Sequence, residues 1–247
     1  TSGIGLATAM EFAMSGASVT LFARNEKKLI DKVSMLECSN KQNHNYLVGD
    51  FDDIESIQKI INNSISKGSN YHILVNNSGG PKGGSIIESD HSEFIVAFKR
   101  HLINNHILSQ ALIPEMIKFN YGRIINIIST SVKEPIIGLG VSNTIRGSVA
   151  SWAKTLSREV AKNNITVNNV LPGFTDTNRL SSLIISKSKS TEKSEEEISN
   201  NMKASVPAGR FGMPQETAKA IAFLASPASG YINGVSLAVD GGRLNSI

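Results

Sequence analysis

The stretch from Arg123 to Lys162 limits the fold most, because it joins two patterns that few architectures combine. Residues 124–128 read Ile-Ile-Asn-Ile-Ile, a short β-branched run typical of a strand buried on both faces of a parallel sheet. Apolar residues then recur at helical spacing, at Ile145, Val149, Trp152, Leu156 and Val160. A buried strand followed by an amphipathic helix predicts one β-α unit of an α/β fold.

The same alternation continues along the chain. Further buried strands are predicted at residues 18–23, 45–48, 72–76, 165–170 and 235–239, and helices at 26–37, 54–61, 92–119 and 214–225. We expect the helix at 92–119 to break near Pro114. There is no internal repeat, and 247 residues suffice for one well-buried core. The sequence therefore predicts a single Rossmann-type domain over residues 1–247, with a doubly wound parallel sheet.

Composition excludes several classes of protein. No apolar run approaches the roughly 18 residues of a membrane helix, so no membrane partner is expected. The single cysteine, Cys38, allows neither an internal disulfide nor a cysteine-based metal site, and we expect a cytoplasmic protein without a metal. A formal charge of +4 without a dense Lys/Arg stripe argues against a nucleic-acid partner.

Polar residues surround the junction between the central strand and its helix. Ser129 follows the strand directly, and Ser142 and Arg146 lie four residues apart near the start of the helix. Residues at this spacing leave one face of a helix. Open α/β sheets bind ligands at the carboxyl ends of their strands, so we expect the functional site here.

This stretch resembles the active-site segment of the short-chain dehydrogenase/reductase family, in which a serine at this strand end precedes a Tyr-x-x-x-Lys motif. Aligned on Ser129, the tyrosine position holds Ser142 and the lysine position holds Arg146. The resemblance covers essentially the whole chain and is to 3-oxoacyl-acyl-carrier-protein reductases. It implies an NADP(H)-dependent oxidoreductase acting on a small carbonyl or alcohol substrate, such as a 3-oxoacyl thioester.

The two replacements leave a second hypothesis open. Serine is a far weaker acid than tyrosine, and Arg146 stays protonated, so the proton supply of the family is missing. The chain is then either an oxidoreductase with a rebuilt centre or a non-catalytic NADP-binding or scaffold protein on the same fold.

The first residues form a glycine turn that enters a helix, with Ser2, Gly3, Ile4 and Gly5 as candidate cofactor contacts. Glycines there let the backbone approach a pyrophosphate at the helix N-terminus. The family has one more strand before this turn, so we expect the first strand of the fold to be missing from the sequence.

Arg24 indicates which nucleotide is bound. It follows the strand at 18–23, where an arginine accommodates a 2′-phosphate and an acidic residue would hold a ribose hydroxyl. Arg24 and Asn25 therefore favour NADP over NAD. Alternatively, Arg24 is a solvated surface charge and Asn25 caps the next helix.

The resemblance implies further cofactor contacts from three loops and one helix. These are Asp50 and Phe51 toward the adenine, Asn77, Ser78 and Gly79 toward the adenosine, Arg146 toward the ribose, and Pro172, Gly173, Thr175 and Thr177 toward the nicotinamide amide and pyrophosphate. Alternatively, Asp52 or Asp53 caps the next helix. Both interpretations can hold, because they use different aspartates.

His101 occupies the position of a family asparagine that supports a water leading to the catalytic lysine. It is either a core or interface histidine or a site residue in place of that asparagine. If it belongs to the site, its titration near neutrality would let it supply the proton that Ser142 cannot.

Residues 178–205 lie where the family has its substrate lid, and the Ser-, Lys- and Glu-rich segment 181–199 is expected to pack poorly and stay mobile. Its apolar residues Leu180, Leu183, Ile184 and Ile185 either close over an apolar substrate or pack as an ordinary helix.

The family usually pairs through two helices, here near residues 103–119 and 142–162. Their extra apolar residues Ile107, Ile113 and Trp152 favour a second buried side and hence a homo-oligomer, dimer or tetramer.

Overall fold

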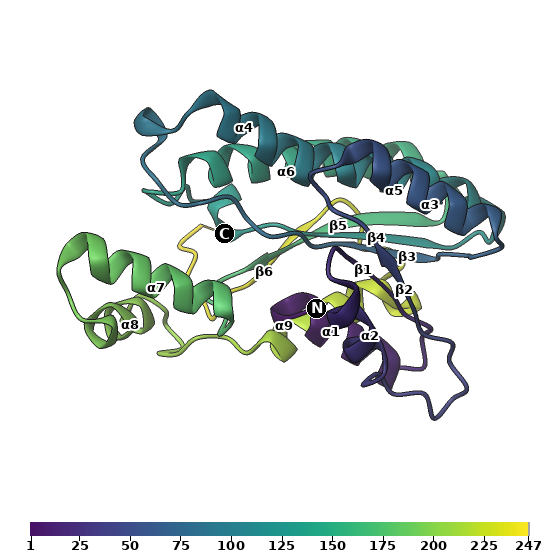
Figure 1. Cartoon of the computed structure of the whole chain (residues 1–247), viewed down its shortest axis with the longest axis horizontal. Coiled ribbons are helices and arrows are strands. Elements are labelled where there is room, and N and C mark those ends of the chain that lie inside the picture. The colour runs from purple at the N-terminus through teal and green to yellow at the C-terminus, as the bar shows by residue number, and fades with distance from the viewer. Residues whose placement is uncertain (247) are drawn as a thin grey trace.

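The structure, a computed structural model, describes residues 1–246 and has three layers, with helices on both faces of a parallel sheet (Figure 1). Its strands are β1 (Thr20–Ala23), β2 (Asn45–Val48), β3 (Ile73–Asn76), β4 (Gly122–Ile127), β5 (Ile165–Pro172) and β6 (Ser236–Val239). The predicted strands are confirmed, with ends that differ by at most two residues. The α/β fold class is therefore as expected.

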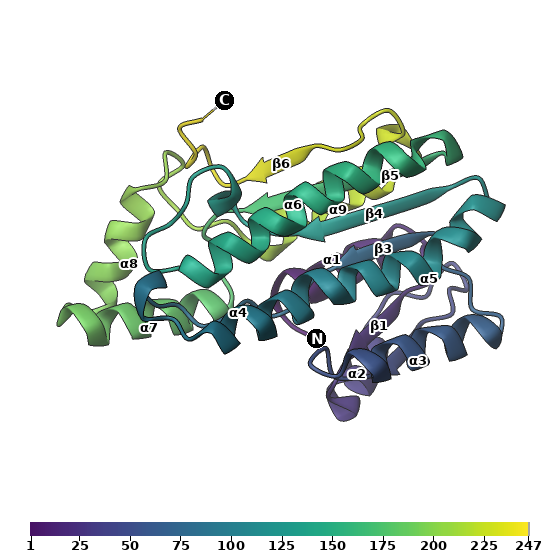
Figure 2. The same cartoon turned by 90° about the horizontal axis from the view of Figure 1, so that it is seen from above.

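Helices cover both faces of the sheet (Figures 1 and 2). One face carries α1 (Gly3–Met14), α2 (Glu26–Val33) and α9 (Pro214–Ala225), and the other carries α3 (Ile54–Ser66), α4 (His91–Phe98), α5 (Asn104–Lys118) and α6 (Gly140–Val160). The remaining two helices, α7 (Asn178–Thr191) and α8 (Glu195–Ala204), project beyond the carboxyl ends of the strands. Within residues 1–246, no helix is long and apolar enough to cross a membrane.

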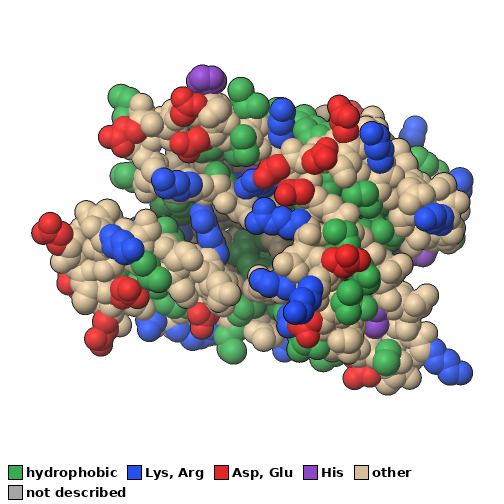
Figure 3. Space-filling view, in the orientation of Figure 1, with side chains coloured by type: hydrophobic (Ala, Val, Ile, Leu, Met, Phe, Trp, Pro, Cys, Tyr) green, Lys and Arg blue, Asp and Glu red, His purple; other side chains and the backbone are tan. Residues whose placement is uncertain are grey.

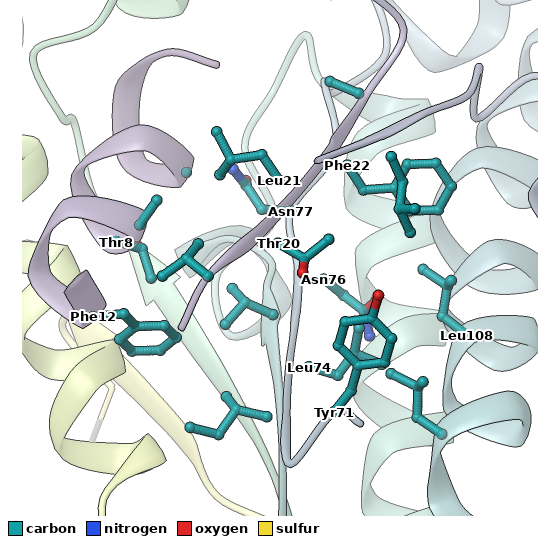
Figure 4. A pocket seen from close by; sticks show the side chains of 18 of the residues that line it. Thr8, Phe12, Thr20, Leu21, Phe22, Tyr71, Leu74, Asn76, Asn77 and Leu108 are labelled. Carbon is teal, nitrogen blue, oxygen red and sulfur yellow. The ribbon is translucent and has the colours of Figure 1, made fainter. Parts of the chain in front are cut away.

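The parallel strands form two groups, β1-β2 and β3-β4-β5-β6. Their arrangement resembles the doubly wound dinucleotide-binding order with its central strand left out. Between β1 and β3 lies a cavity of about 570 Å³. Side chains from α1, β1, β3 and α5 line it, among them Phe12, Leu21, Leu74 and Leu108 (Figure 4). The described residues thus place no strand between β1 and β3, as the sequence led us to expect.

The expected helix at 92–119 differs from the observed one. It is interrupted by a π-helical segment at Lys99–Ile103, and α5 then runs through Pro114 to Lys118. The predicted break at Pro114 is therefore wrong. Pro114 and Gln110, four residues before it, are both exposed, so the carbonyl that loses its helical partner faces water.

The segment expected to pack poorly forms the two helices α7 and α8. Leu180, Ile198 and Met202 are buried together, and Leu183 and Ile184 pack against them. The expectation of poor packing is thus wrong for the apolar side, because helical spacing gathers its few apolar residues on one face. A mobile substrate lid at 178–205 stays a prediction.

The residues named for oligomerisation have contacts within one chain. Trp152 and Ile113 are half-buried and pack against the main core cluster. Their packing within one chain does not test the second buried side, and the homo-oligomer stays a prediction.

A ladder of buried side chains crosses four strands. Asn76, Asn126, Asn169 and Ser236 are directly opposite one another in the parallel register. Asn76 Nδ2 donates to Asn126 Oδ1 at 2.9 Å, Asn126 Nδ2 to Asn169 Oδ1 at 3.0 Å, and Asn169 Nδ2 to Ser236 Oγ at 3.1 Å. Buried amides are costly unless paired, so the ladder stabilises this register over any other.

Removing the middle of this ladder should destabilise the protein. Asn126→Ala leaves Asn76 Nδ2 and Asn169 Oδ1 buried without partners, and we expect a loss of about 3 kcal/mol in the free energy of unfolding. Urea denaturation measures it. Asn62→Ala, on the exposed side of α3, is the control and should change stability by less than about 0.5 kcal/mol. Equal losses in both variants would contradict the role of the ladder.

Candidate active site

Three separate segments meet at the start of α1. Gly3 has a φ of +54°, and a Cβ atom there would lie 3.2 Å from Cγ2 of Thr177. A Cβ atom at Gly5 would lie 2.6 Å from Nδ2 of Asn77, which only a shift of that amide could relieve. The predicted contacts Gly3, Gly5, Asn77 and Thr177 are therefore brought together, and the glycines are required by the close approach.

The N-terminus of α1 keeps its amide groups available. Ser2 is the N-cap residue, and its side chain makes no capping hydrogen bond. Ile4 packs inward against the core cluster of β4 and β5. Uncapped N–H groups at the positive end of a helix, with glycines clearing the space in front, fit a pyrophosphate.

The end of β1 presents an exposed arginine. The side chain of Arg24 is 74% exposed, and within residues 1–246 it forms one long ion pair, with Nη1 3.8 Å from Oδ2 of Asp50. Asn25 caps α2 by accepting from the Lys28 amide, which confirms the capping role foreseen for it. Arg24 is thus only weakly paired and available to a phosphate.

The loop after β2 is fixed by contacts with β1 and α5. Phe51 packs against Phe22 with ring centroids 5.3 Å apart, and its carbonyl accepts from Asn104 Nδ2 at 2.6 Å. Asp53, and not Asp50, caps α3. Asp50 is therefore not used as a helix cap, and its contact with the adenine stays a prediction.

The loop after β5 supports the same edge. A Cβ atom at Gly173 would lie 2.7 Å from the Cα atom of Asp240, so this turn packs directly on the end of β6. Thr175 Oγ1 donates to the Gly173 carbonyl at 3.3 Å, and Thr177 caps α7. Pro172 ends β5. The turn thereby fixes where Thr177 meets Gly3.

Arg146 and Ser129 share the carboxyl end of β4. Arg146 Nη1 donates to the Ile127 carbonyl at 2.8 Å, two residues before Ser129. Ser129 is half-buried, and its Oγ accepts from the Ser131 amide at 3.1 Å. Ser142 is half-buried one helical turn before Arg146, and its hydroxyl has no hydrogen-bond partner within residues 1–246. Burial, and after it the charge of Arg179, lower the pKa of Arg146 to about 10.

His101 is buried in the π-helical segment, and its charge state differs from the expectation. Its Nδ1 lies 2.8 Å from Ser78 Oγ, while Nε2 is buried without a partner. Burial, and then the charges of Arg146 and Arg100, lower the pKa of His101 to about 3. The prediction that His101 titrates near neutrality is therefore wrong. Protonation would add a positive charge to a buried imidazole beside two guanidinium groups, which is unfavourable.

Arg179, at the start of α7, was missed at the sequence level. Its Nη2 donates to the Pro81 carbonyl at 2.6 Å, which ties α7 to the loop after β3. A Cβ atom at Gly80 would lie 3.3 Å from Nη2 of Arg146 and 3.9 Å from Nη2 of Arg179. Lys and Arg side chains surround the central hollow of this face (Figure 3). In the sequence, the only signal for a role of Arg179 is its position two residues after Thr177.

The fold and this glycine-lined edge define a dinucleotide-binding α/β protein. Comparison with known proteins gives the family. A family model described as enoyl-(acyl carrier protein) reductase matches residues 1–243. The 3-oxoacyl-acyl-carrier-protein reductase FabG of Haemophilus influenzae is 34% identical over 98% of this chain and 94% of its own length. That of Rickettsia typhi is 36% identical over 98% and 92%. The chain belongs to the short-chain dehydrogenase/reductase family.

Solved structures agree with this assignment. YwfH, an NADPH-dependent reductase involved in bacilysin biosynthesis, has a TM-score of 0.93 at 26% identity and covers 100% of this chain and 96% of its own. L-Sorbose reductase from Gluconobacter frateurii, complexed with NADPH and L-sorbose, has a TM-score of 0.92 at 27% identity and covers 100% and 94%. The Rossmann-like fold of the family is therefore present over the whole length.

The lowered pKa of His101 predicts how stability depends on pH. Between the unfolded pKa of about 6.5 and the folded value of about 3, only the unfolded chain takes up a proton at this site, so stability falls as pH falls. The loss approaches about 1.4 kcal/mol per pH unit in this window. His101→Gln should remove that slope in urea denaturation between pH 6.5 and 4.5.

The exposed His91 provides the matched control for this measurement. His91→Gln should keep the slope of the wild type. A wild-type slope that His101→Gln leaves unchanged would show that His101 titrates normally.

Proposed function

We propose that this protein is an NADP(H)-dependent oxidoreductase that acts on a carbonyl or hydroxyl substrate. The observation that carries the proposal is the meeting of Gly3 with Thr177 and of Gly5 with Asn77, one end of a cradle whose other end is Arg146 beside Ser129. Structural relatives described as NADPH-dependent or solved with NADPH support the cofactor. The substrate of one of them, L-sorbose, is a small carbonyl compound.

The residues present fit this cofactor. The N-terminus of α1 and Thr177 would hold the pyrophosphate, Arg24 the 2′-phosphate, and Arg146 the ribose hydroxyls. Asn77, Ser78, Gly79 and the loop from Pro172 to Thr175 would line the remaining length. When bound, the nicotinamide supplies or accepts a hydride.

The side chains of the protein then stabilise the negative charge on the substrate oxygen and determine the source of the proton. In reduction, Ser129 donates a hydrogen bond to the substrate oxygen, and Arg146 stabilises the negative charge that develops there. Ser142 is too weak an acid to replace tyrosine, and His101 is neutral at physiological pH. The proton is therefore taken from solvent, and turnover is slower than with a tyrosine.

The competing proposal is a non-catalytic NADP-binding protein, which the replacement of tyrosine by Ser142 favours. Both proposals use the same cofactor cradle. Only turnover separates them, and the test is NADPH consumption with a panel of ketones, 3-oxo acids and 3-oxoacyl thioesters.

Arg24 should select the phosphorylated cofactor. We expect Arg24→Ala to weaken NADPH binding about tenfold, through loss of a charge-assisted contact, and to leave NADH binding unchanged. Fluorescence titration of each nucleotide measures the two affinities. Arg158→Ala, which removes an exposed arginine at the far end of α6, is the control. Equal wild-type affinities for NADPH and NADH would refute the role of Arg24.

Ser142→Tyr should restore the missing general acid. A tyrosine one turn before Arg146 gains a neighbouring cation that lowers its pKa, so we expect the turnover number to rise about 10²-fold on any substrate that the wild type reduces. Ser129→Ala should lower it at least about tenfold. NADPH binding without consumption in the wild type and in Ser142→Tyr alike would refute the enzyme proposal and support the binding protein.

A further inference from the structure

Two guanidinium groups converge on one point beside the reaction site. Nη2 of Arg146 and Nη2 of Arg179 both lie less than 4 Å from the position that a Cβ atom would take at Gly80. They come from different elements, Arg146 from the second turn of α6 and Arg179 from the first turn of α7. Any side chain at residue 80 would enter the space between them.

Neither guanidinium group has an acidic partner. Within residues 1–246, no Asp or Glu carboxylate lies within 4 Å of Arg146 or Arg179 in an ion pair. Each group donates one hydrogen bond to a backbone carbonyl, Arg146 to Ile127 and Arg179 to Pro81. A guanidinium group has five N–H donors, so most donors of both groups remain available.

Placing two like charges together is unfavourable unless an anion lies between them. The mutual repulsion of Arg146 and Arg179 contributes to the lowered pKa of Arg146. A carboxylate matches the planar fork of arginine and accepts two parallel hydrogen bonds from it. Such a ligand would offset both the repulsion and the burial of Arg146.

The pair borders the proposed cofactor site, since Arg179 is two residues after Thr177, and Arg146 extends it toward the end of β4. The proposed pyrophosphate site lies at Gly3, Gly5 and Thr177. Arg146 donates to the Ile127 carbonyl at the end of β4, two residues before Ser129, which is expected to bind the substrate oxygen. The space between the two arginines is therefore next to the reacting carbonyl.

We propose that Arg146 and Arg179 together bind a carboxylate of the substrate, so that the substrate is an oxo acid or hydroxy acid whose carboxylate lies close to the reacting carbon. This inference rests on the proposed function. It also separates this chain from the activity named for its relatives, since a 3-oxoacyl thioester has no charge next to its carbonyl.

The test compares an acid with its neutral ester. Calorimetric titration of the protein saturated with NADP⁺ measures binding of 3-oxohexanoate and of methyl 3-oxohexanoate, because the oxidised cofactor cannot reduce either ketone. We expect the acid to bind at least about tenfold more tightly than the ester. Arg179→Gln should remove that difference and leave the affinities for the ester and NADP⁺ unchanged.

Two further variants refine the result. Arg179→Lys keeps the charge but loses the planar fork, and should retain part of the preference for the acid. Arg158→Gln makes the same charge change on an exposed residue elsewhere and should behave as the wild type. Equal binding of acid and ester by the wild type, or a loss of NADP⁺ affinity in Arg179→Gln, would overturn the proposal.

Measurements of turnover separate the carboxylate site from the proposed reductase function on which it rests. Binding of the acid through Arg179 without any NADPH consumption would support the carboxylate site and refute the reductase. Consumption of NADPH with acid and ester at the same kcat/KM would support the reductase and refute the carboxylate site.

Discussion

The amide ladder across β3, β4, β5 and β6 is the interaction on which the site depends. Because Asn76, Asn126 and Asn169 are paired in one register, the residues that follow them leave the sheet at one level. Asn77, Ser129 and the turn at Gly173 therefore lie along the same edge of the sheet although they are far apart in the chain. A slip of one residue would turn each of these asparagines to the other face of the sheet and disperse the site.

Short-range patterns made the fold predictable. Runs of β-branched residues located the strands to within two residues, and the glycine turn, the cap at Asn25 and the helical spacing in α6 each have a local physical cause. The π-helical segment at Lys99–Ile103 and the packing of α7 on α8 have no such local signature. They depend on contacts between segments, as does the meeting of Arg146 with Arg179, which no spacing in the sequence indicates.

His101 shows why the role of a residue is harder to predict than its place. The sequence located it correctly on the helix, but an imidazole takes its pKa from its surroundings. Here the surroundings are a buried helix interior and two guanidinium groups, which together keep it neutral. Its hydrogen bond to Ser78 then makes it a packing and positioning group for the loop after β3 and not a proton donor.

The replacement of lysine by Arg146 changes how positive charge is used in this centre. A lysine can give up its proton and so relay protons to a tyrosine, whereas a guanidinium group remains charged throughout. Without tyrosine there is nothing to relay to, and a permanent cation that stabilises charge on the substrate oxygen is the more useful group. A second permanent cation, Arg179, adds charge beside the first at a point where only Gly80 leaves room. In the proposed reductase, the altered residues would therefore form a consistent set: they would give up proton transfer within the protein and gain a fixed positive field, which would act most strongly on a substrate that is itself an anion.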